Sequence, residues 1–581
     1  MRQTRLLMVV AVACVTIAVG MAVSTHVVRG QASPPIYNPY PPGILPSDIA
    51  SEEARIQREI AGIEKSYVTQ WQALTPPVVA GNPPILMNTG YDAQRILGGL
   101  LQYDLTISPF QNRACASCHM PYVAYSGPIP SVNLTMIAYP GSAIYRAAKR
   151  TAQRYTYSHA FPVLNYNATQ GAFFGGNFWD SRATGYKLQA PDAEQAQGPP
   201  VDPLEMGFPD IACIAYRISS APYLPLFMTV WGDSFNINWP SNTASICATP
   251  NGAAVFNGSA TPIMLSADDR TKATNIYDHW GQSLSFLERS TDISPYSSKF
   301  DAYLKGSYTL TATEAAGYKL FNGKANCNSC HLDGRSTAPS PTAPSAEDTG
   351  TTAGTTPSFT CFGSANLGLP KNPRVALLYE TTPDSYGYTP NPEGYIYTDF
   401  GLGTFLRSGF GSFPNPNSAW LPFAETSDGK MQTMTARNVG LAPSQCPTTE
   451  APGPYFQKEF FHNGYIKSLK QLVHFYNTRD VYRNSAVESG DCPAGTTEKV
   501  NCWPAAEVSV NEDMTVGNLG LTDTEENEIV AFLQTLSDGY VTPYPYIGTY
   551  TGACMSGGTA ATQGNSTLIS AQFLKSLKNS R

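Results

Sequence analysis

The chain has 581 residues, of which 42% are hydrophobic and only 14% are charged. Its length suggests two to four structural units with substantial cores. The 48 glycines and 47 prolines indicate long loops and argue against a coiled coil or an α-solenoid. The net charge is −7 and the sequence has no basic blocks, which excludes a typical nucleic-acid-binding protein.

The N-terminus has the features of an export signal. Arg2 and Arg5 precede an uncharged, almost wholly apolar run of 18 residues from Leu6 to Val23. Small residues around Ala32 suit a signal peptidase, so we expect residues 1–32 to be a signal peptide. An uncleaved N-terminal membrane anchor is the alternative, because 18 residues barely span a bilayer. Both readings predict a periplasmic or otherwise exported protein, in a compartment that permits disulfides.

Helical patterns dominate the rest of the chain. The proline-rich residues 33–48 predict an extended segment, and residues 51–73 have apolar positions at helical spacing. Thr311 with Glu314 and Thr522 with Glu525 form capping-box patterns. We expect helices over 312–321 and 521–539 after these caps. Few runs alternate with the period of a strand, so the predicted fold class is mainly α with long irregular loops.

Two copies of the pattern C-x-x-C-H carry the strongest chemical signal. They occupy Cys115, Cys118 and His119, and then Cys327, Cys330 and His331. In this pattern two thiols bind the vinyl groups of a c-type heme, and the adjacent histidine ligates the iron. A single copy is also compatible with a redox dithiol or half of a zinc site. Two copies in an exported chain, each following a helical segment, predict two covalently bound hemes c and a duplicated unit.

The segment between the two motifs resembles the bacterial diheme cytochrome c peroxidase/MauG family. The resemblance rests on a set of motifs that extends over essentially the whole mature chain. These motifs are Phe178-Trp179-Asp180-Ser181-Arg182-Ala183, Gln195-Ala196-Gln197-Gly198-Pro199, Glu205-Met206, Asp301-Ala302-Tyr303-Leu304, Arg437-Asn438-Val439 and Phe461-His462-Asn463-Gly464. Each motif alone would be weak evidence, but together they are specific.

The resemblance implies a fold of two cytochrome c-like domains with one heme each. We expect an N-terminal domain over 33–300, with the peroxidatic heme, and a C-terminal domain over 301–542, with the electron-transfer heme. The Ser/Thr/Pro/Gly-rich residues 336–357 predict a flexible loop within the second domain. Residues 543–581 predict a loose C-terminal tail.

The resemblance also implies roles for individual residues. His119 would bind the iron at which peroxide reacts, and His331 would bind the iron of the second heme. Glu205 and Gln195 would line the distal pocket of the first heme. Trp179 would relay electrons between the hemes, although the sequence also allows it to be a core aromatic. His462 matches a family histidine that is not a heme ligand.

General chemistry supports the role of Glu205 independently. Cleavage of the peroxide O–O bond requires a proton to move from one oxygen to the other. A carboxylate in a water-poor pocket can move that proton as a base and then as an acid. Burial would raise the pKa of Glu205 toward the working range. Gln195 can orient peroxide by hydrogen bonding but cannot carry the proton alone.

Tyr476 departs from the pattern of the cytochrome c peroxidases. Those proteins ligate the second heme with a methionine at the corresponding distance from Gly464, whereas the MauG branch has a tyrosine there. The resemblance therefore implies that Tyr476 is an axial ligand, and His474 is the rival. A phenolate stabilises ferric iron, so this heme would have a low potential. The remaining alternative is that Tyr476 is a packed aromatic side chain and not a heme ligand.

Two further departures concern the first heme and calcium. The G-H-x-W segment that supplies a removable distal histidine in related peroxidases is missing, and His159 is the only histidine between His119 and Trp179. The first heme is thus expected to be open without prior reduction. The family's Thr-x-Pro calcium partners are not matched, so the sequence gives no clear case for calcium.

Seven cysteines lie outside the heme motifs and the signal segment. Cys213 with Cys247 and Cys492 with Cys502 are plausible disulfides from their positions, although spacing does not fix the connectivity. The others are Cys361, Cys446 and Cys554. An odd number leaves at least one free thiol.

Together these features predict an exported enzyme that reduces hydrogen peroxide to water. The expected electron donor is a small cytochrome c or cupredoxin, and a homodimer is compatible with the sequence. Two alternatives stay open. One is a MauG-like oxidase that modifies a partner protein, which Tyr476 favours, and the other is a non-enzymatic electron-transfer diheme cytochrome, which Glu205 with Gln195 disfavours.

Overall fold

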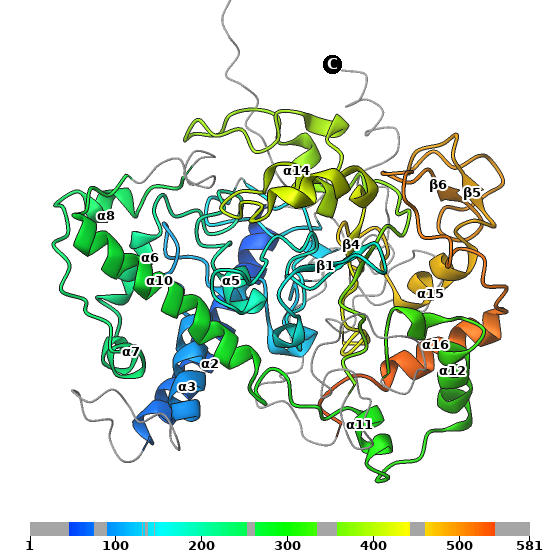
Figure 1. Cartoon of the computed structure of the whole chain (residues 1–581), viewed down its shortest axis with the longest axis horizontal. Coiled ribbons are helices and arrows are strands. Elements are labelled where there is room, and N and C mark those ends of the chain that lie inside the picture. Colours follow the sequence, from blue (N-terminus) through cyan, green and yellow to red (C-terminus); the bar gives the residue numbers. More distant parts are fainter. Residues whose placement is uncertain are drawn as a thin grey trace, which may run out of the picture. The chain divides into compact units, whose positions relative to one another are not determined.

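The computed structural model describes residues 46–74, 90–129, 132–133, 137–144, 146–251, 262–333, 357–441 and 459–540. The predicted signal or anchor, the C-terminal tail from 543, Cys446, Cys554 and all of the predicted loop 336–357 except its last residue lie outside these ranges. The helices, several of them shown in Figure 1, are α2 (Pro46–Gln72), α3 (Gly90–Gln102), α5 (Pro191–Ala196), α6 (Ala212–Ile218), α7 (Leu224–Trp231), α8 (Thr243–Ile246), α10 (Ala267–Glu288), α11 (Lys299–Leu304), α12 (Ala312–Asn322), α14 (Leu402–Ser408), α15 (Leu469–Thr478) and α16 (Asp523–Gln534).

Strands are few and very short within the described residues. Antiparallel pairs join β1 (Asn165–Asn167) to β2 (Ala172–Phe174) and β3 (Ser364–Ala365) to β4 (Met431–Gln432). A parallel pair joins β5 (Arg483–Asn484) to β6 (Trp503–Pro504). Irregular segments and short 3₁₀ turns connect most of the helices. The predicted mainly helical class with long loops is confirmed.

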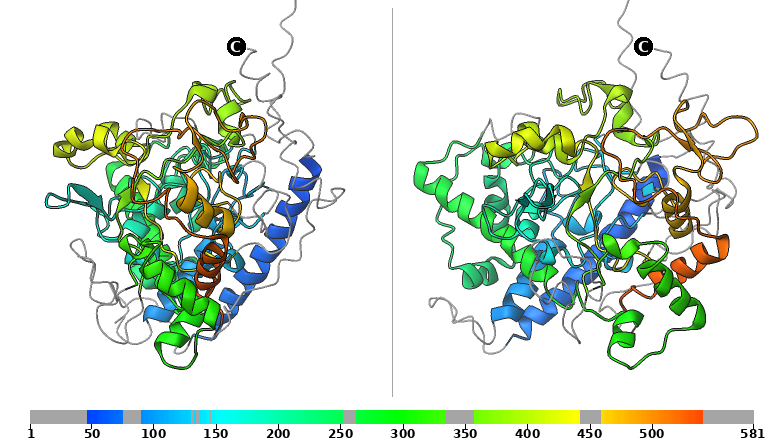
Figure 2. Two further views of the ribbon diagram at one scale, coloured as in Figure 1. Left: turned by 90° about the vertical axis from the view of Figure 1, so that its right-hand side faces the viewer. Right: turned by 45° about the vertical axis from the view of Figure 1, so that its right-hand side comes forward.

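Helices α2, α3 and α10 build the core of the N-terminal half. Figures 1 and 2 show α2 and α3, in blue, beside the long green helix α10. Two consecutive glycines allow this approach, since a Cβ on Gly98 would collide with Ser283 of α10, and one on Gly99 would collide with the ring of Tyr67 on α2. Leu97, Leu100, Ile276 and Trp280 are buried between these helices.

Helices α12 and α16 lie side by side in the C-terminal half (Figure 1). Both begin with the predicted capping box: Thr311 accepts from the backbone of Glu314, and Thr522 accepts from that of Glu525. Gly317 allows the close contact, because a Cβ there would collide with the backbone of Glu528. The aromatic cluster around Phe300, Phe321, Phe359 and Phe532 fills the space between these helices and the second heme motif.

Two predicted boundaries differ from those observed. The segment 33–48 was expected to be extended, but Pro46 already begins α2, since proline is well tolerated in the first turn of a helix. The helix expected over 521–539 ends at Gln534. Backbone groups beyond it are held by tertiary contacts instead, for example the hydrogen bond from Asp538 N to Asn438 Oδ1, 2.8 Å.

The described residues belong to one compact unit, which begins at Pro39. Buried ion pairs connect segments far apart in the chain: Arg150 contacts both Asp180 and Asp399 at 2.7 Å, and Arg437 contacts Asp301 at 2.8 Å. The domain boundary at residues 300 and 301 stays a prediction.

Both predicted disulfides are present, Cys213–Cys247 and Cys492–Cys502. Among the described cysteines outside the heme motifs, Cys361 is a free thiol, and its backbone N–H donates to the carbonyl of Cys330 at 2.7 Å. None of the helices in the described ranges is long and apolar enough to cross a membrane.

Candidate heme sites

The first C-x-x-C-H motif forms a tight 3₁₀ turn that orients its histidine. Cys118 N donates to the carbonyl of Cys115 at 3.2 Å, and His119 N donates to that of Ala116 at 3.3 Å. Nδ1 of His119 lies 2.6 Å from the carbonyl oxygen of Tyr125. If Nδ1 carries the proton for this bond, Nε2 keeps its lone pair for a metal. Burial lowers the pKa of His119 to about 4, which also favours the neutral, ligating form.

The second motif repeats this arrangement. Cys330 N donates to the carbonyl of Cys327 at 3.2 Å, and His331 N donates to the same oxygen at 2.9 Å. Nδ1 of His331 lies 3.0 Å from the carbonyl oxygen of Phe359. Burial lowers the pKa of His331 as well. Both histidines are therefore neutral, held by a backbone carbonyl and free to bind a metal through Nε2.

A cavity of about 290 Å³ opens beside the first motif. Cys115, Cys118 and His119 line it together with the three residues that the sequence analysis assigned to catalysis, Glu205, Gln195 and Trp179. Gln195 belongs to the short helix α5, while Glu205 lies in the loop that follows it. The structure thus brings together side chains that are up to 90 positions apart in the sequence.

Glu205 has the electrostatic character of a proton carrier. Burial raises the pKa of its carboxyl to about 8, the neighbouring carboxylate of Asp202 raises it further, and Arg182 opposes both effects. A carboxyl group with a pKa near neutrality can both release and accept a proton under physiological conditions. Asp202 and Arg182 line the same cavity.

Trp179 lies between the two candidate heme sites, because its side chain lines both cavities. Its indole N–H donates to the carbonyl of Thr151 at 3.2 Å, and its own carbonyl accepts from Gln432 N at 2.8 Å. These bonds fix the ring at the wall that separates the cavities. The role of Trp179 as a relay stays a prediction.

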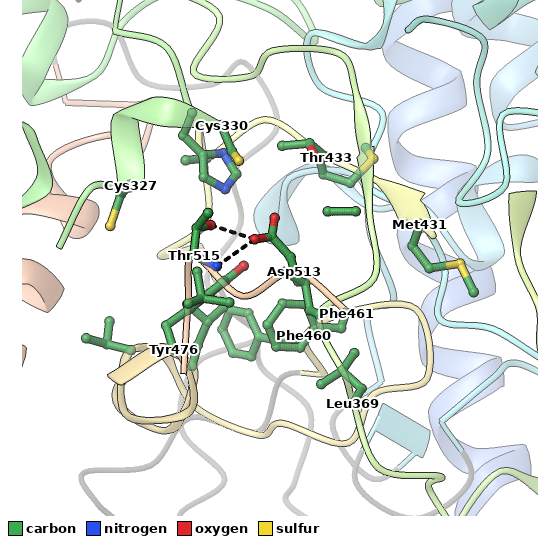
Figure 3. A pocket seen from close by; sticks show the side chains of 18 of the residues that line it. Cys327, Cys330, Leu369, Met431, Thr433, Phe460, Phe461, Tyr476, Asp513 and Thr515 are labelled. Carbon is green, nitrogen blue, oxygen red and sulfur yellow. Dashed lines mark hydrogen bonds between the residues drawn. The ribbon is translucent and has the colours of Figure 1, made fainter. Parts of the chain in front are cut away.

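The second cavity, about 190 Å³, is lined by Cys327, Cys330, His331 and Tyr476. Figure 3 shows Tyr476 in this cavity with Phe460 and Phe461 nearby, and Cys327 and Cys330 on the other side. Burial raises the pKa of the Tyr476 phenol, so the phenol stays protonated unless a cation such as iron stabilises the phenolate. Among the described residues, no carboxylate forms a hydrogen bond with the phenol of Tyr476.

His474, the rival ligand, does not line the second cavity. Its Nδ1 lies 2.8 Å from Glu526 Oε1, and its Nε2 lies 2.8 Å from the carbonyl oxygen of Val500. His474 and Tyr476 are two residues apart on α15, so their side chains cannot lie on the same face of the helix. With both ring nitrogens engaged, His474 is placed for a structural role.

The two remaining histidines of interest differ in location. His462 lines the second cavity, is 8% exposed and lies with its ring 6.4 Å from that of Trp179; burial lowers its pKa to about 4. His159 lies beside Glu288 and Asp192 and does not line the first cavity. Within the described part of the chain, His119 is the only histidine that lines the first cavity.

Other residues at these cavities carried no signal in the sequence. Arg154 lines the second cavity, and its buried Nη1 lacks a hydrogen-bond partner among the described residues. Lys149 lines the first cavity with its Nζ 3.0 Å from Tyr397 Oη. Spacing could not reveal them because they enter from loops whose course depends on tertiary contacts.

The donor sets fit heme c. Each cavity presents a pair of thiols, a neutral histidine fixed through Nδ1, and mostly apolar walls. Nη2 of Arg154 donates to the carbonyl of Thr435 at 3.2 Å, and the unpartnered Nη1 would suit a heme propionate, which is an anion. Cys115, Cys118 and His119 would hold one heme, and Cys327, Cys330 and His331 the other.

Comparisons with known proteins agree with this reading. The sequence profile of the di-haem cytochrome c peroxidase family matches residues 92–309, which include the first heme motif, Trp179, Gln195 and Glu205. Methylamine utilization protein MauG of Paracoccus denitrificans is 26% identical over 451 residues, 77% of this chain and 89% of that protein. Cytochrome-c peroxidase IdrP1 of Denitromonas iodatirespirans is 24% identical over 469 residues, 79% of this chain and 84% of that protein.

A solved structure shares the fold. It is a tyrosine-to-methionine variant of the diheme peroxidase BthA from Burkholderia thailandensis, with a TM-score of 0.51 and 22% identity over 79% of this chain and 89% of that one. The chain is thus similar to the di-haem cytochrome c peroxidase/MauG family, through the family model over residues 92–309 and through relatives that match over more than three quarters of its length. The resemblance inferred from the sequence motifs is thereby confirmed.

Proposed function

We propose that this protein reduces hydrogen peroxide to water at its first heme, with electrons delivered by a small redox protein through the second heme. The observation that carries the proposal is the position of Glu205 and Gln195 in the cavity of His119, with the pKa of Glu205 raised to about 8. A protein that only transfers electrons needs no proton carrier beside its heme. The overall reaction consumes one peroxide, two electrons and two protons and yields two waters.

The residues of the first cavity would divide the work. Heme bound here would supply the iron that exchanges electrons with peroxide, and His119 would hold that iron through Nε2. Gln195 would orient peroxide by hydrogen bonding. Glu205 would accept the proton of the oxygen nearer to the iron and give it to the departing oxygen, which leaves as water. The largely apolar walls exclude bulk water and strengthen these interactions.

Electrons would reach the first site through Trp179. Trp179 lines both cavities, which supports this relay. His331 and Tyr476 would hold the iron of the second heme, and a phenolate ligand would favour the ferric state. With His474 hydrogen-bonded elsewhere, Tyr476 is the better candidate of the two.

Tyr476 also favours a second candidate function. A MauG-like oxidase, which would use the same chemistry to oxidise an amino acid on a partner protein, is supported by this tyrosine and by the similarity to methylamine utilization protein MauG. Under either function, the proposed location of the protein is the periplasm or the outside of the cell. The two disulfides are compatible with an oxidising compartment.

Steady-state peroxide consumption tests the proposal. The holoprotein should consume peroxide with a reduced small cytochrome c or cupredoxin, faster than with an artificial dye at equal driving force. Rapid turnover with the redox protein supports the peroxidase. Turnover with neither donor, although both hemes are bound, would contradict it and favour the protein-modifying oxidase.

A further inference from the structure

We propose that Tyr386 is a surface site at which small phenols are oxidised, and that Tyr388 connects it to the first heme cavity. Tyr388 lines this cavity together with His119 and Glu205. Tyr386 lies two residues earlier in the chain and is 49% exposed. The inference rests on the proposed function, because peroxide must first oxidise the heme site of this cavity. It adds an entry for electrons that does not use Trp179 or the second heme.

A single stretch of chain separates the first cavity from the surface at this point. Tyr388 and Pro390 line the cavity, whereas residues 385–387 are exposed. The stretch thus has one phenol in the cavity wall and another in contact with solvent. Electron transfer through protein slows steeply with distance, so a thin wall with two oxidisable side chains is a favourable route from the surface to the cavity.

A tight turn holds the two tyrosines in a fixed relation. Asp384 Oδ1 accepts from Tyr386 N at 2.9 Å and from Tyr388 N at 3.0 Å. The backbone of Asp384 closes the turn, because its N–H donates to the carbonyl of Tyr388 at 2.9 Å and its carbonyl accepts from Gly387 N at 3.0 Å. Gly387 has a φ of +75°, which glycine adopts without strain.

The guanidinium of Arg146 lies against both rings. Its central carbon is 4.6 Å from the centroid of the Tyr388 ring and 6.0 Å from that of Tyr386. The side chain of Arg146 is fully buried, and its Nε pairs with Asp384 at 2.6 Å while its Nη1 donates to the carbonyl of Asn251 at 2.6 Å. Because both rings contact one immobile group, the step between them is short.

The exposed end of this route is an aromatic pair. The ring of Phe110, which is 40% exposed, has its centroid 6.0 Å from that of Tyr386. Two exposed rings side by side allow a small planar ring to pack on them. The charges against the pair, Asp384 and Arg146, neutralise each other, which favours an uncharged ligand. A phenol meets both conditions, and its O–H bond is chemically similar to that of tyrosine.

The oxidation balances with two phenols for each peroxide. Tyr388 loses an electron to the oxidised heme site and its proton to a carboxylate of the same cavity, such as Asp202. An electron from Tyr386 restores Tyr388, which takes its proton back, while the proton of Tyr386 goes to water. The phenol then gives a hydrogen atom to the Tyr386 radical and leaves as a phenoxyl radical. Two such rounds supply the two electrons and, through solvent, the two protons that convert one peroxide to two waters.

Radical trapping in the holoprotein tests the site without any donor. The holoprotein, fully ferric or with one heme reduced, is mixed with peroxide and a nitroso spin trap, and its peptides are analysed by mass spectrometry. We expect a trap adduct on Tyr386. Tyr386→Phe should remove it, and Tyr388→Phe should lower its yield about tenfold, because the connection to the cavity is weakened.

The matched control is Tyr186→Phe, since Tyr186 is 46% exposed and lines neither cavity. This variant should keep the adduct on Tyr386. An adduct that is absent from Tyr386 in both redox forms of the wild type, or that is unchanged in Tyr388→Phe, would overturn the proposal.

Steady-state turnover provides the second readout. The measured quantity is the ratio of peroxide-dependent guaiacol oxidation to peroxide turnover with a reduced small cytochrome c. Tyr386→Phe keeps the ring that contacts Phe110 and Arg146, and it should lower this ratio about tenfold. Tyr186→Phe should leave the ratio unchanged. An equal ratio in the wild type and Tyr386→Phe would overturn the surface site. Guaiacol turnover with the Tyr386 adduct, but no turnover with the redox protein, would instead contradict the donor of the proposed function and leave the surface site standing.

Discussion

The two candidate heme cavities are alike at the C-x-x-C-H motif and different in the other residues that line them. In both, a 3₁₀ turn presents a histidine whose Nδ1 is held by a backbone carbonyl, Tyr125 in one and Phe359 in the other. The first cavity is also lined by Glu205 from an acidic loop, whereas the second is lined by the phenol of Tyr476. The same arrangement of thiols and histidine is thus combined with two different chemical environments.

This difference indicates how a duplicated unit can acquire two roles. Attachment requires only five consecutive residues and a carbonyl acceptor, which both halves retained. The difference comes from residues that enter each cavity from elsewhere: the loop after α5 supplies buried carboxyl groups in the first, and α15 supplies a phenol in the second. Trp179, which lines both cavities, joins the two environments.

Replacing the acidic group of the first cavity should have the largest effect. Glu205→Gln removes the proton carrier while keeping size and polarity, so peroxide turnover should fall by about 10²–10⁴-fold, the usual contribution of general acid–base catalysis. Both hemes and their absorption bands should be retained. Steady-state peroxide consumption measures the loss.

Glu64→Gln is the matched control for that variant. Burial also raises the pKa of Glu64, but this residue belongs to α2 and does not line the first cavity. Its turnover should equal that of the wild type. Normal turnover in Glu205→Gln would assign Glu205 to structure and remove the chemical contrast between the cavities.

Weakening the connection between the cavities should have an intermediate effect. Trp179→Phe keeps an aromatic ring but removes the indole, and we expect electron transfer between the hemes to slow by about tenfold, a barrier increase of about 1.4 kcal/mol. Rapid-mixing spectroscopy with a reduced second heme measures this step.

The control for the relay is Trp231→Phe, because Trp231 stacks on His279 and lines neither cavity. That variant should transfer electrons at the wild-type rate. Equal rates in the two variants would mean that Trp179 serves packing rather than electron transfer.

Removing His474 should affect stability and leave the second heme unchanged. His474→Ala loses the hydrogen bonds to Glu526 and Val500, which should lower the free energy of unfolding by about 1 kcal/mol. Chemical denaturation measures this change, and the electron paramagnetic resonance spectrum should not move. A changed heme spectrum would make His474 the ligand in place of Tyr476.

The same variant should show a defined pH dependence. Burial alone would lower the pKa of His474, but the hydrogen bonds to Glu526 and Val500 outweigh it and raise the pKa. The ion pair with Glu526 is therefore fully present below the unfolded-state pKa of about 6.5 and is lost as the pH rises through the higher folded-state value. The stability difference between wild type and His474→Ala should be larger at pH 6 than at pH 9.

The sequence was informative where function depends on contiguous residues. The heme motifs, the capping boxes at Thr311 and Thr522, and the spacing of Gln195 and Glu205 depend on local geometry, which short patterns encode. Both disulfide pairs were also predicted, because Cys492 and Cys502 close a short loop and Cys213 and Cys247 flank an insertion. The family motifs predicted the family.

Features that depend on long-range packing could not be read from spacing. Asp202 carried no signal in the sequence, and only the fold places it in the same cavity as Glu205. Tyr476 and His474 were rivals in the sequence because they are two positions apart, and only the helix orientation of α15 sends one to the cavity and the other to Glu526. Arg154 had no signal in the sequence, because only the fold brings its side chain to the second cavity.

The contrast between an open first heme and a closed second heme is tested most directly by cyanide binding to the fully ferric holoprotein. Cyanide occupies a free coordination position of ferric iron, and electron paramagnetic resonance counts the hemes that bind it. We predict that one heme of the wild type binds cyanide without prior reduction and that both bind it in Tyr476→Phe. Binding to neither heme of the wild type, or to only one heme in Tyr476→Phe, would contradict the account.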